Sequence, residues 1–180
     1  MNLKKDSPFW SWREIEGWLT EEEGKKLQEL CLNKNIIEVG SYKGRSTACI
    51  ADVAKLVYSV DTHKALGDGQ HQVDNLTTWR EFRHNTGGYF NIIPFCGQLS
   101  QWVDTLPKVD IAFIDGDHTL SGVKGDIKLL QNKAKLLIFH DYCHGFPAVM
   151  IVVDIFIDIQ GVCGSLAWGT IKESKLSSVT

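Results

Sequence analysis

The chain has 180 residues, enough for one domain with a buried core, and its composition, 43% hydrophobic and 23% charged, is that of a globular protein. A net charge of −3 without a lysine- or arginine-rich run argues against a nucleic-acid partner. No stretch reaches the roughly 20 apolar residues of a membrane span, and the start MNLKKDSPFW lacks the apolar run of a signal peptide, so we expect a cytoplasmic protein without a membrane partner.

Residues 1–34 are expected to form an N-terminal helical segment that packs on a single domain covering residues 1–180. The spacing of Thr20 and Glu23 is that of a capping box and predicts a helix from this point through EEEGKKLQELC. Packing is the favoured role of the aromatic residues before this helix, with a substrate rim as the alternative. These residues are Trp10, Trp12 and Trp18.

Short apolar runs alternate with helical patterns from residue 36 onward. Strands are predicted at 36–40, 56–61, 90–96, 109–115, 134–141 and 164–173. Helices are predicted at 44–55, 75–85, 98–106 and 121–133, and also from Pro147 to about Asp158 despite the β-branched residues there. This alternation is typical of an α/β, Rossmann-like three-layer sandwich with a mainly parallel sheet.

Polar residues follow the predicted strands at the point where each strand ends. Ligands of such sheets bind beyond the carboxyl ends of the strands, so these residues are candidates for one site. Helix capping explains one polar residue per strand, but it does not explain DGDH and HDY together. The candidates are Glu38, Gly40 and Ser41, then Asp61 and Thr62, then Gly97 and Gln98, then Asp115 and His118, and finally His140 and Asp141.

The turn after the first strand narrows the choice of ligand. Gly40 and Gly44 lie too far apart for the close glycine pair that a pyrophosphate favours. Asp61 follows about 20 residues later, where a carboxylate can accept hydrogen bonds from ribose hydroxyls. Ser46 and Thr47 offer hydroxyl contacts, with helix capping as the alternative. The pattern favours S-adenosylmethionine, an adenosine compound without phosphate.

The segments IIEVGSYKGRST, VYSVDTH, VDIAFIDGDHTLSGVKGDI and LLIFHDY, in this order, resemble class I S-adenosylmethionine-dependent methyltransferases, most closely the small-molecule O-methyltransferase-like family. The resemblance covers roughly residues 18–172 and implies a seven-stranded sheet with an antiparallel last strand. It also implies a sixth strand, expected here in abbreviated form within 158–163. The cofactor residues that turn chemistry and resemblance together indicate are Glu38, Gly40, Ser41, Gly44, Ser46, Thr47, Asp61, Thr62, Gly97, Gln98 and Asp115.

Metal-dependent relatives imply a Mg²⁺ site at Asp115, His140 and Asp141, where the metal would lower the pKa of a substrate hydroxyl. The alternative is catalysis without metal, with His118 or His140 as the general base. The chain departs from its relatives at Gln98, where they often carry an acidic residue, and at Leu120, where they often carry an aromatic one.

The expected function is therefore methyl transfer from S-adenosylmethionine to a hydroxyl of a small molecule, such as a sugar or a secondary metabolite. Two alternatives stay open at this point. One is a methyltransferase-like domain that binds S-adenosylmethionine without turnover, which the departures at Gln98 and Leu120 motivate. The other is an NAD-dependent oxidoreductase, against which the missing glycine pair weighs. The sequence is compatible with a homo-oligomer under each of these three hypotheses.

Overall fold

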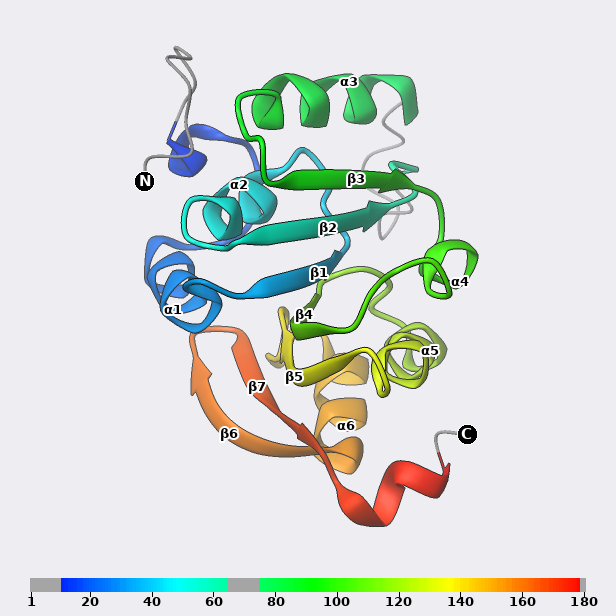
Figure 1. Ribbon diagram of the computed structural model, residues 1–180. Helices are drawn as coiled ribbons and strands as arrows, with labels where there is room; N and C mark the ends of the chain where they lie inside the picture. Colours follow the sequence, from blue (N-terminus) through cyan, green and yellow to red (C-terminus); the bar gives the residue numbers. More distant parts are fainter. Residues whose placement is uncertain (1–10, 65–74, 179–180) are drawn as a thin grey trace.

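The computed structural model describes residues 11–64 and 75–178. Its strands form one seven-stranded sheet in the order β3-β2-β1-β4-β5-β7-β6 (Figure 1). Trp10 lies outside the described residues. The strands are β1 (Asn35–Val39), β2 (Leu56–Asp61), β3 (Ile92–Cys96), β4 (Val109–Ile114), β5 (Ala134–Phe139), β6 (Ile157–Cys163) and β7 (Leu166–Ile171).

The sheet is mainly parallel, and its last strand runs against the others. β1 pairs in parallel with β2 and β4, β2 with β3, and β4 with β5. β7 lies between β5 and β6 and is antiparallel to both. The predicted α/β fold, a Rossmann-like sheet with an antiparallel last strand, is thereby confirmed.

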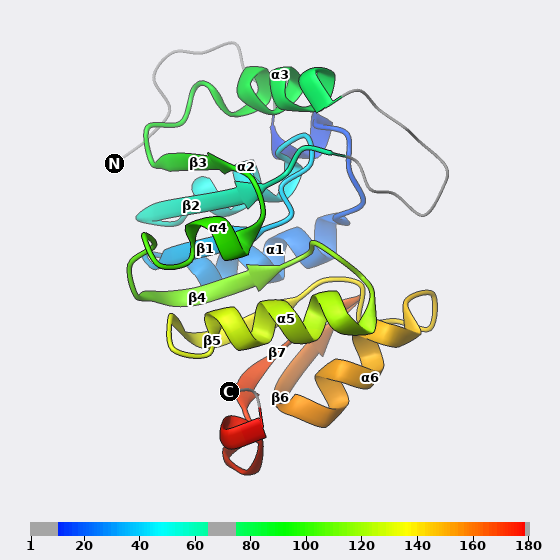
Figure 2. The same ribbon diagram turned by 90° about the vertical axis from the view of Figure 1, so that its right-hand side faces the viewer.

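Helices cover both faces of the sheet and complete three layers. Figure 2 shows α4, α5 and α6 in front of the sheet, with α1 and α2 behind it. Alternate strand residues supply the two cores: Ile36 and Phe113 face one layer, whereas Ile37 and Ile114 face the other. The helices are α1 (Glu21–Cys31), α2 (Arg45–Ala51), α3 (Asn75–Thr86), α4 (Leu99–Trp102), α5 (Leu120–Leu130) and α6 (Pro147–Phe156), with short 3₁₀ turns η1 (Trp12–Glu14) and η2 (Glu173–Ser178).

The N-terminal segment divides into a buried and an exposed part. The Thr20 side chain accepts a hydrogen bond from the Glu23 backbone, and the Glu23 carboxylate accepts one from the Thr20 backbone, so the predicted capping box is confirmed. Trp12 is completely buried, as the packing prediction requires. Trp18 departs from that prediction: it is 74% exposed, with its ring centroid 5.3 Å from that of Tyr42.

The run from Pro147 contains both a helix and a strand. Pro147 occupies the first turn of α6, where proline fits a helix start, and the helix ends at Phe156. β6 begins at the next residue and pairs with β7 over its length, with a register shift between Ile159 and Gly161. The expectation of an abbreviated sixth strand is therefore wrong, because pairing with β7 extends the strand through seven residues.

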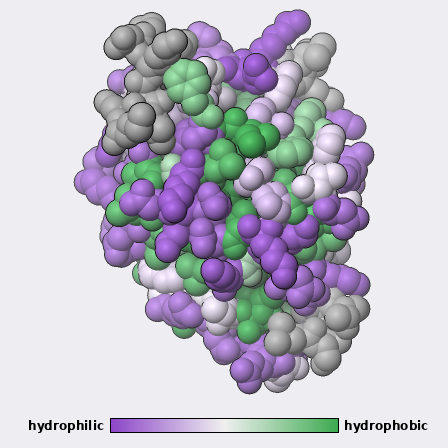
Figure 3. Space-filling view, in the orientation of Figure 1, coloured by the Kyte–Doolittle hydropathy of each residue, from purple (hydrophilic) through white to green (hydrophobic). Residues whose placement is uncertain are grey.

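The surface of the described region is mixed in character. The face seen in Figure 3 interleaves hydrophilic and hydrophobic residues and has no broad continuous apolar area. Within residues 11–64 and 75–178, none of the helices combines the length and apolar character that crossing a membrane requires.

Candidate active site

The turn after β1 brings three strand ends together. Gly40 has a φ of 87°, a conformation that glycine adopts without strain, and its N–H donates to the carbonyl of Val60 at 3.0 Å. A Cβ at Gly40 would lie 2.0 Å from the backbone oxygen of Asp115. The ends of β1, β2 and β4 therefore meet at this residue, and only a residue without a side chain fits there.

The carboxylate of Asp61 accepts hydrogen bonds from the backbone of this turn. Oδ2 accepts the backbone N–H groups of Ser41 at 2.6 Å and Tyr42 at 2.7 Å, and Oδ1 accepts that of His63 at 2.5 Å. Asp61 and Asp115 thus flank the same turn, as the strand-end argument predicts. Each carboxylate oxygen has two lone pairs, so Asp61 retains acceptor capacity for a ligand hydroxyl.

Glu38 lies beneath the turn and is completely buried. Its carboxylate accepts the hydroxyls of Ser41 at 3.1 Å, Ser46 at 2.6 Å and Thr47 at 2.5 Å. Burial raises the pKa of Glu38 to about 7, although the three hydroxyl groups act in the opposite direction.

Part of the predicted cofactor set is buried. Glu38, Ser46 and Thr47 were expected to contact the cofactor, but their polar groups are directed at one another below the surface. Gly44, also in the predicted set, has a φ of 92° and opens α2 without a side-chain cap. These residues hold the shape of the turn, and the Ser41 hydroxyl is buried with them against Glu38.

The end of β3 lies next to Asp61. The Gly97 N–H donates to the Asp61 carbonyl at 2.9 Å, and a Cβ at Gly97 would lie 2.6 Å from Oε1 of Gln101. Gln98 is exposed and starts α4, and its backbone N–H donates to Gln101 at 2.7 Å. Thr62 is half-buried beside Asp61. The structure therefore brings the predicted residues of the second and third strand ends to one place.

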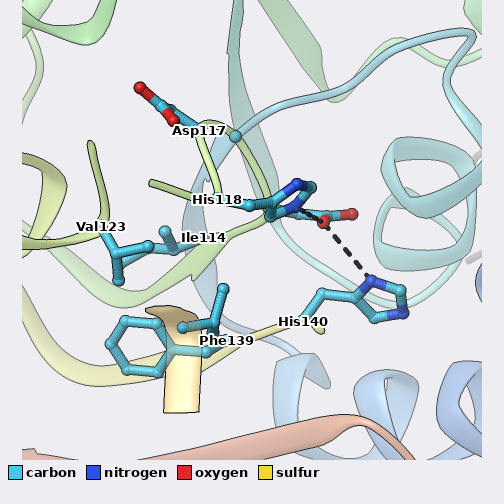
Figure 4. A pocket seen from close by; sticks show the side chains of 9 residues that line it. Ile114, Asp117, His118, Val123, Phe139 and His140 are labelled. Carbon is cyan, nitrogen blue, oxygen red and sulfur yellow. Dashed lines mark ion pairs between the residues drawn. The ribbon is translucent and has the colours of Figure 1, made fainter. Parts of the chain in front are cut away.

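Two imidazoles and two carboxylates meet at the ends of β4 and β5, and Figure 4 shows the imidazoles, His118 and His140, together with one of the carboxylates. Nδ1 of His140 lies 3.4 Å from Oδ1 of Asp115 and 3.3 Å from Oδ1 of Asp141. Nε2 of His118 lies 3.6 Å from Oδ1 of Asp115 and 3.0 Å from Oδ2 of Asp141. The two imidazoles and two carboxylates alternate in a closed ring, which we call the charged cluster.

The carboxylates hold both imidazoles in the protonated form. Contacts with Asp115 and Asp141 raise the pKa of His118 to about 10. Burial opposes protonation of His140, but the surrounding carboxylates outweigh it and raise its pKa to about 12. Burial also works against the Asp141 charge, yet the two imidazoles keep its pKa well below the usual range. The raised pKa values of His118 and His140 favour the protonated form of each ring over the role of general base.

Glu23 is a member of this neighbourhood that strand-end reasoning missed. It belongs to α1, and its Oε2 lies 3.7 Å from Nε2 of His140. Its position in a capping box predicted only the start of a helix. No sequence signal linked it to His140, because the contact depends on how α1 packs beside β5.

The charged cluster does not fit the predicted Mg²⁺ ion. One atom from each of Asp115, His140 and Asp141 lies within 4.8 Å of the others, close enough for a shared ion. Mg²⁺ favours a set of oxygen ligands, however, and one of these three donors is an imidazole. Both nitrogens of that imidazole face carboxylates, and its Nδ1 lies within 3.4 Å of both aspartates. We therefore assign no metal here.

Residues 37–151 match a family model described as a methyltransferase domain. The chain belongs to this family. The match contains the turn, Asp61 and the charged cluster, whereas α1, β6 and β7 lie outside it. No curated protein gave a match.

Solved structures of several other proteins, an O-methyltransferase among them, share the fold. A cofactor-bound protein from MTB is 15% identical, with a TM-score of 0.67, over 89% of this chain and 84% of that one. An O-methyltransferase from Bacillus cereus in complex with SAH is 12% identical, with a TM-score of 0.64, over 86% and 83%. The fibrillarin pre-rRNA processing protein of Methanococcus jannaschii is 12% identical, with a TM-score of 0.62, over 93% and 87%.

Proposed function

We propose that this protein is an S-adenosylmethionine-dependent methyltransferase that acts on a hydroxyl of a small molecule, such as a sugar or a secondary metabolite. The observation that carries the proposal is the contact between Gly40 and the backbone of Asp115. It joins the turn, which would hold the cofactor, to the charged cluster, which would hold the acceptor. A methyl donor and a hydroxyl must be aligned in this way for in-line transfer.

The turn suits S-adenosylmethionine better than a dinucleotide. The N–H groups of Ser41 and Tyr42 are both engaged by Asp61, so they are not free to bind a pyrophosphate. Phosphate oxygens would also meet the negative charge of Asp61. S-adenosylmethionine has no phosphate, and its positive sulfonium is compatible with an acidic sheet edge. One of its ribose hydroxyls can donate to the lone pair that remains on Oδ1 of Asp61.

The charged cluster supplies groups for an acceptor hydroxyl. When bound, S-adenosylmethionine provides a methyl carbon open to attack by oxygen. The protonated imidazole of His118, whose side chain is 36% exposed, stabilises negative charge as it develops on that oxygen. Asp115 takes the hydroxyl proton, since its side chain is 24% exposed against 15% for Asp141. Asp141 keeps both imidazoles protonated and in place.

A small acceptor is preferred over RNA on grounds of charge. RNA binding relies on positive groups that face phosphates, whereas the imidazoles of the candidate site are paired with Asp115 and Asp141, and Asp61 adds a further carboxylate. The net charge of −3 points the same way. Likeness to the fibrillarin protein is a likeness of fold and carries no acceptor with it.

The test combines binding with turnover. We expect S-adenosylmethionine and its demethylated product to raise the unfolding temperature of the protein, and NAD to leave it unchanged. Labelled S-adenosylmethionine is then offered with a panel of sugars, phenols and alcohols, and with RNA. Transfer to a hydroxyl compound supports the proposal. Stabilisation by NAD alone would overturn it, binding without transfer to any acceptor would indicate a non-catalytic domain, and transfer to RNA would replace the acceptor class.

A further inference from the structure

Glu23 is a buried carboxylate that holds two distant parts of the chain together. It is 3% exposed, and its Oε1 accepts the backbone N–H of Ser165 at 2.6 Å and its hydroxyl at 2.7 Å. Oε2 accepts the backbone N–H of Thr20 at 2.9 Å and its hydroxyl at 2.8 Å. A Cβ at Gly164 would lie 2.6 Å from Oε1. The turn between β6 and β7 is therefore shaped to admit this carboxylate.

The carboxylate of Glu23, on α1, also faces His140 of the charged cluster. Its Oε2 lies 3.7 Å from Nε2 of His140, a buried nitrogen that has no hydrogen-bond partner among the residues the structure describes. The other ring nitrogen, Nδ1, faces Asp115 and Asp141. The imidazole is thus enclosed by carboxylates on opposite sides. Rotating the ring would turn a carbon edge toward one of them, which disfavours any other orientation.

We propose that Glu23 is a positioning residue of the methyltransferase site, whose carboxylate orients His140 so that Nδ1 faces Asp115 and Asp141. This inference rests on the function proposed above. Glu23 touches neither acceptor nor cofactor and acts only through the imidazole. The pKa of the Glu23 carboxyl agrees with the assignment: burial opposes its charge, but His140 and the hydrogen bonds hold the pKa well below the usual range.

The inference extends the site beyond the part of the chain that matches the family. That match covers residues 37–151, whereas Glu23 precedes it and Ser165 follows it. The N-terminal helix and the β6–β7 turn would then both be needed for a correctly oriented imidazole. A role of this kind depends on the charge of residue 23, and packing alone would not provide it.

The experiment compares Glu23→Gln with Ser165→Ala. Glutamine keeps the size of the side chain and removes its charge, while Ser165→Ala removes one hydrogen bond to the same carboxylate and leaves the charge facing His140. The ring signals of His140 are followed by NMR during a pH titration and assigned by their loss in His140→Asn. The groups facing this ring are Glu23, Asp115 and Asp141, with Phe113 at its edge.

We expect Glu23→Gln to lower the titration midpoint of His140 by about 1 pH unit or more and to shift its ring nitrogen signals, because one of three facing carboxylates is gone. Ser165→Ala should leave both unchanged. An unchanged midpoint in folded Glu23→Gln, or an equal change in both variants, would overturn the inference. Should Glu23→Gln not fold, Glu23→Asp keeps the charge but withdraws it by one methylene. A smaller fall is then expected, and no fall counts against the proposal.

Stabilisation by S-adenosylmethionine is measured on the same samples. The wild type, Glu23→Gln and Ser165→Ala should all be stabilised to a similar extent, because Glu23 does not touch the cofactor turn. Loss of the stabilisation in Glu23→Gln alone would contradict a role that acts only through His140. Its absence in the wild type would reject the proposed function itself, while the His140 titration would still decide whether Glu23 holds the ring.

Discussion

Glu38 and Asp141 lie at the same edge of the sheet, but their carboxylates are satisfied in different ways. Glu38 accepts three neutral hydroxyls and is completely buried, and its pKa is raised to about 7. Asp141 faces two imidazoles, and its pKa falls well below the usual range. The neutral hydroxyls around Glu38 do not offset the cost of burying a charged carboxylate. The protonated imidazoles around Asp141 stabilise the charge by more than that cost. The carboxyl groups of Glu38 and Asp141 therefore respond to pH in opposite directions.

Disrupting the contact between the turn and the charged cluster at Gly40 should have the largest effect on stability. Gly40→Ala would place a Cβ against the backbone oxygen of Asp115 at a φ that alanine rarely adopts. We expect a loss of roughly 3–5 kcal/mol in the free energy of unfolding, measured with urea.

The control for this change is Gly125→Ala in α5, where an added Cβ meets no atom within 4 Å. That variant should gain up to about 1 kcal/mol, since alanine favours a helix interior. Equal effects of the two alanines would mean that the turn and the charged cluster are not held together at Gly40.

Glu38→Gln should change how the free energy of unfolding depends on pH. Folded Glu38 keeps its proton up to about pH 7, whereas the unfolded side chain releases it near 4.5. The folded state binds more protons in that window, so this residue makes stability fall as pH rises through it, by about 3 kcal/mol. Glutamine removes that slope. Urea unfolding at several pH values between these limits tests this, and parallel curves for variant and wild type would contradict it.

Asp141→Asn should change the pH dependence of stability in the acid range. Its folded pKa is depressed, so its contribution is present above the ordinary value of 3.8 and is lost as pH falls below it. Asparagine tolerates the positive φ of 59° found there, and we expect a cost of about 2 kcal/mol at neutral pH that disappears in acid. The exposed Asp104→Asn is the control, with less than about 0.5 kcal/mol expected. A cost that persists in acid would argue against ion pairing.

Mg²⁺ should have the smallest effect of all. Because the cluster aspartates already face protonated imidazoles, adding Mg²⁺ or a chelator should move the unfolding temperature by less than about 1 °C. Saturable stabilisation by Mg²⁺ that Asp141→Asn abolishes would show that a metal displaces the imidazoles, and it would reverse the assignment made above.

The fold could be predicted largely from sequence because most elements carry an unambiguous local pattern. β2 and β4 are short apolar runs followed by polar residues, a sequence pattern typical of buried parallel strands. The segment around Ile157 was harder, since its apolar residues suit a helix and a strand equally. Its pairing with β7, which a single sequence does not display, decides the boundary.

The candidate site was predictable only to the level of strand ends. Asp61 and Asp115 could be brought together from sequence because parallel strands end at a common edge. The burial of the individual side chains could not be predicted: Glu38 and Thr47, both expected to contact the cofactor, are completely buried. The charge of His140 could not be predicted either, because it depends on how closely Asp115 and Asp141 approach the ring and on Glu23, which approaches from a different layer of the molecule.

The hydrogen bonds from Ser165 to Glu23 span 142 residues. During synthesis the N-terminal helix emerges long before the strand that completes this contact. Until then the carboxylate of Glu23 lacks two of its donors, and closing so long a loop comes at a late stage of folding. Shortened chains that stop before the final hairpin would thus retain most of the sheet, yet leave the imidazole beside it without its complete support.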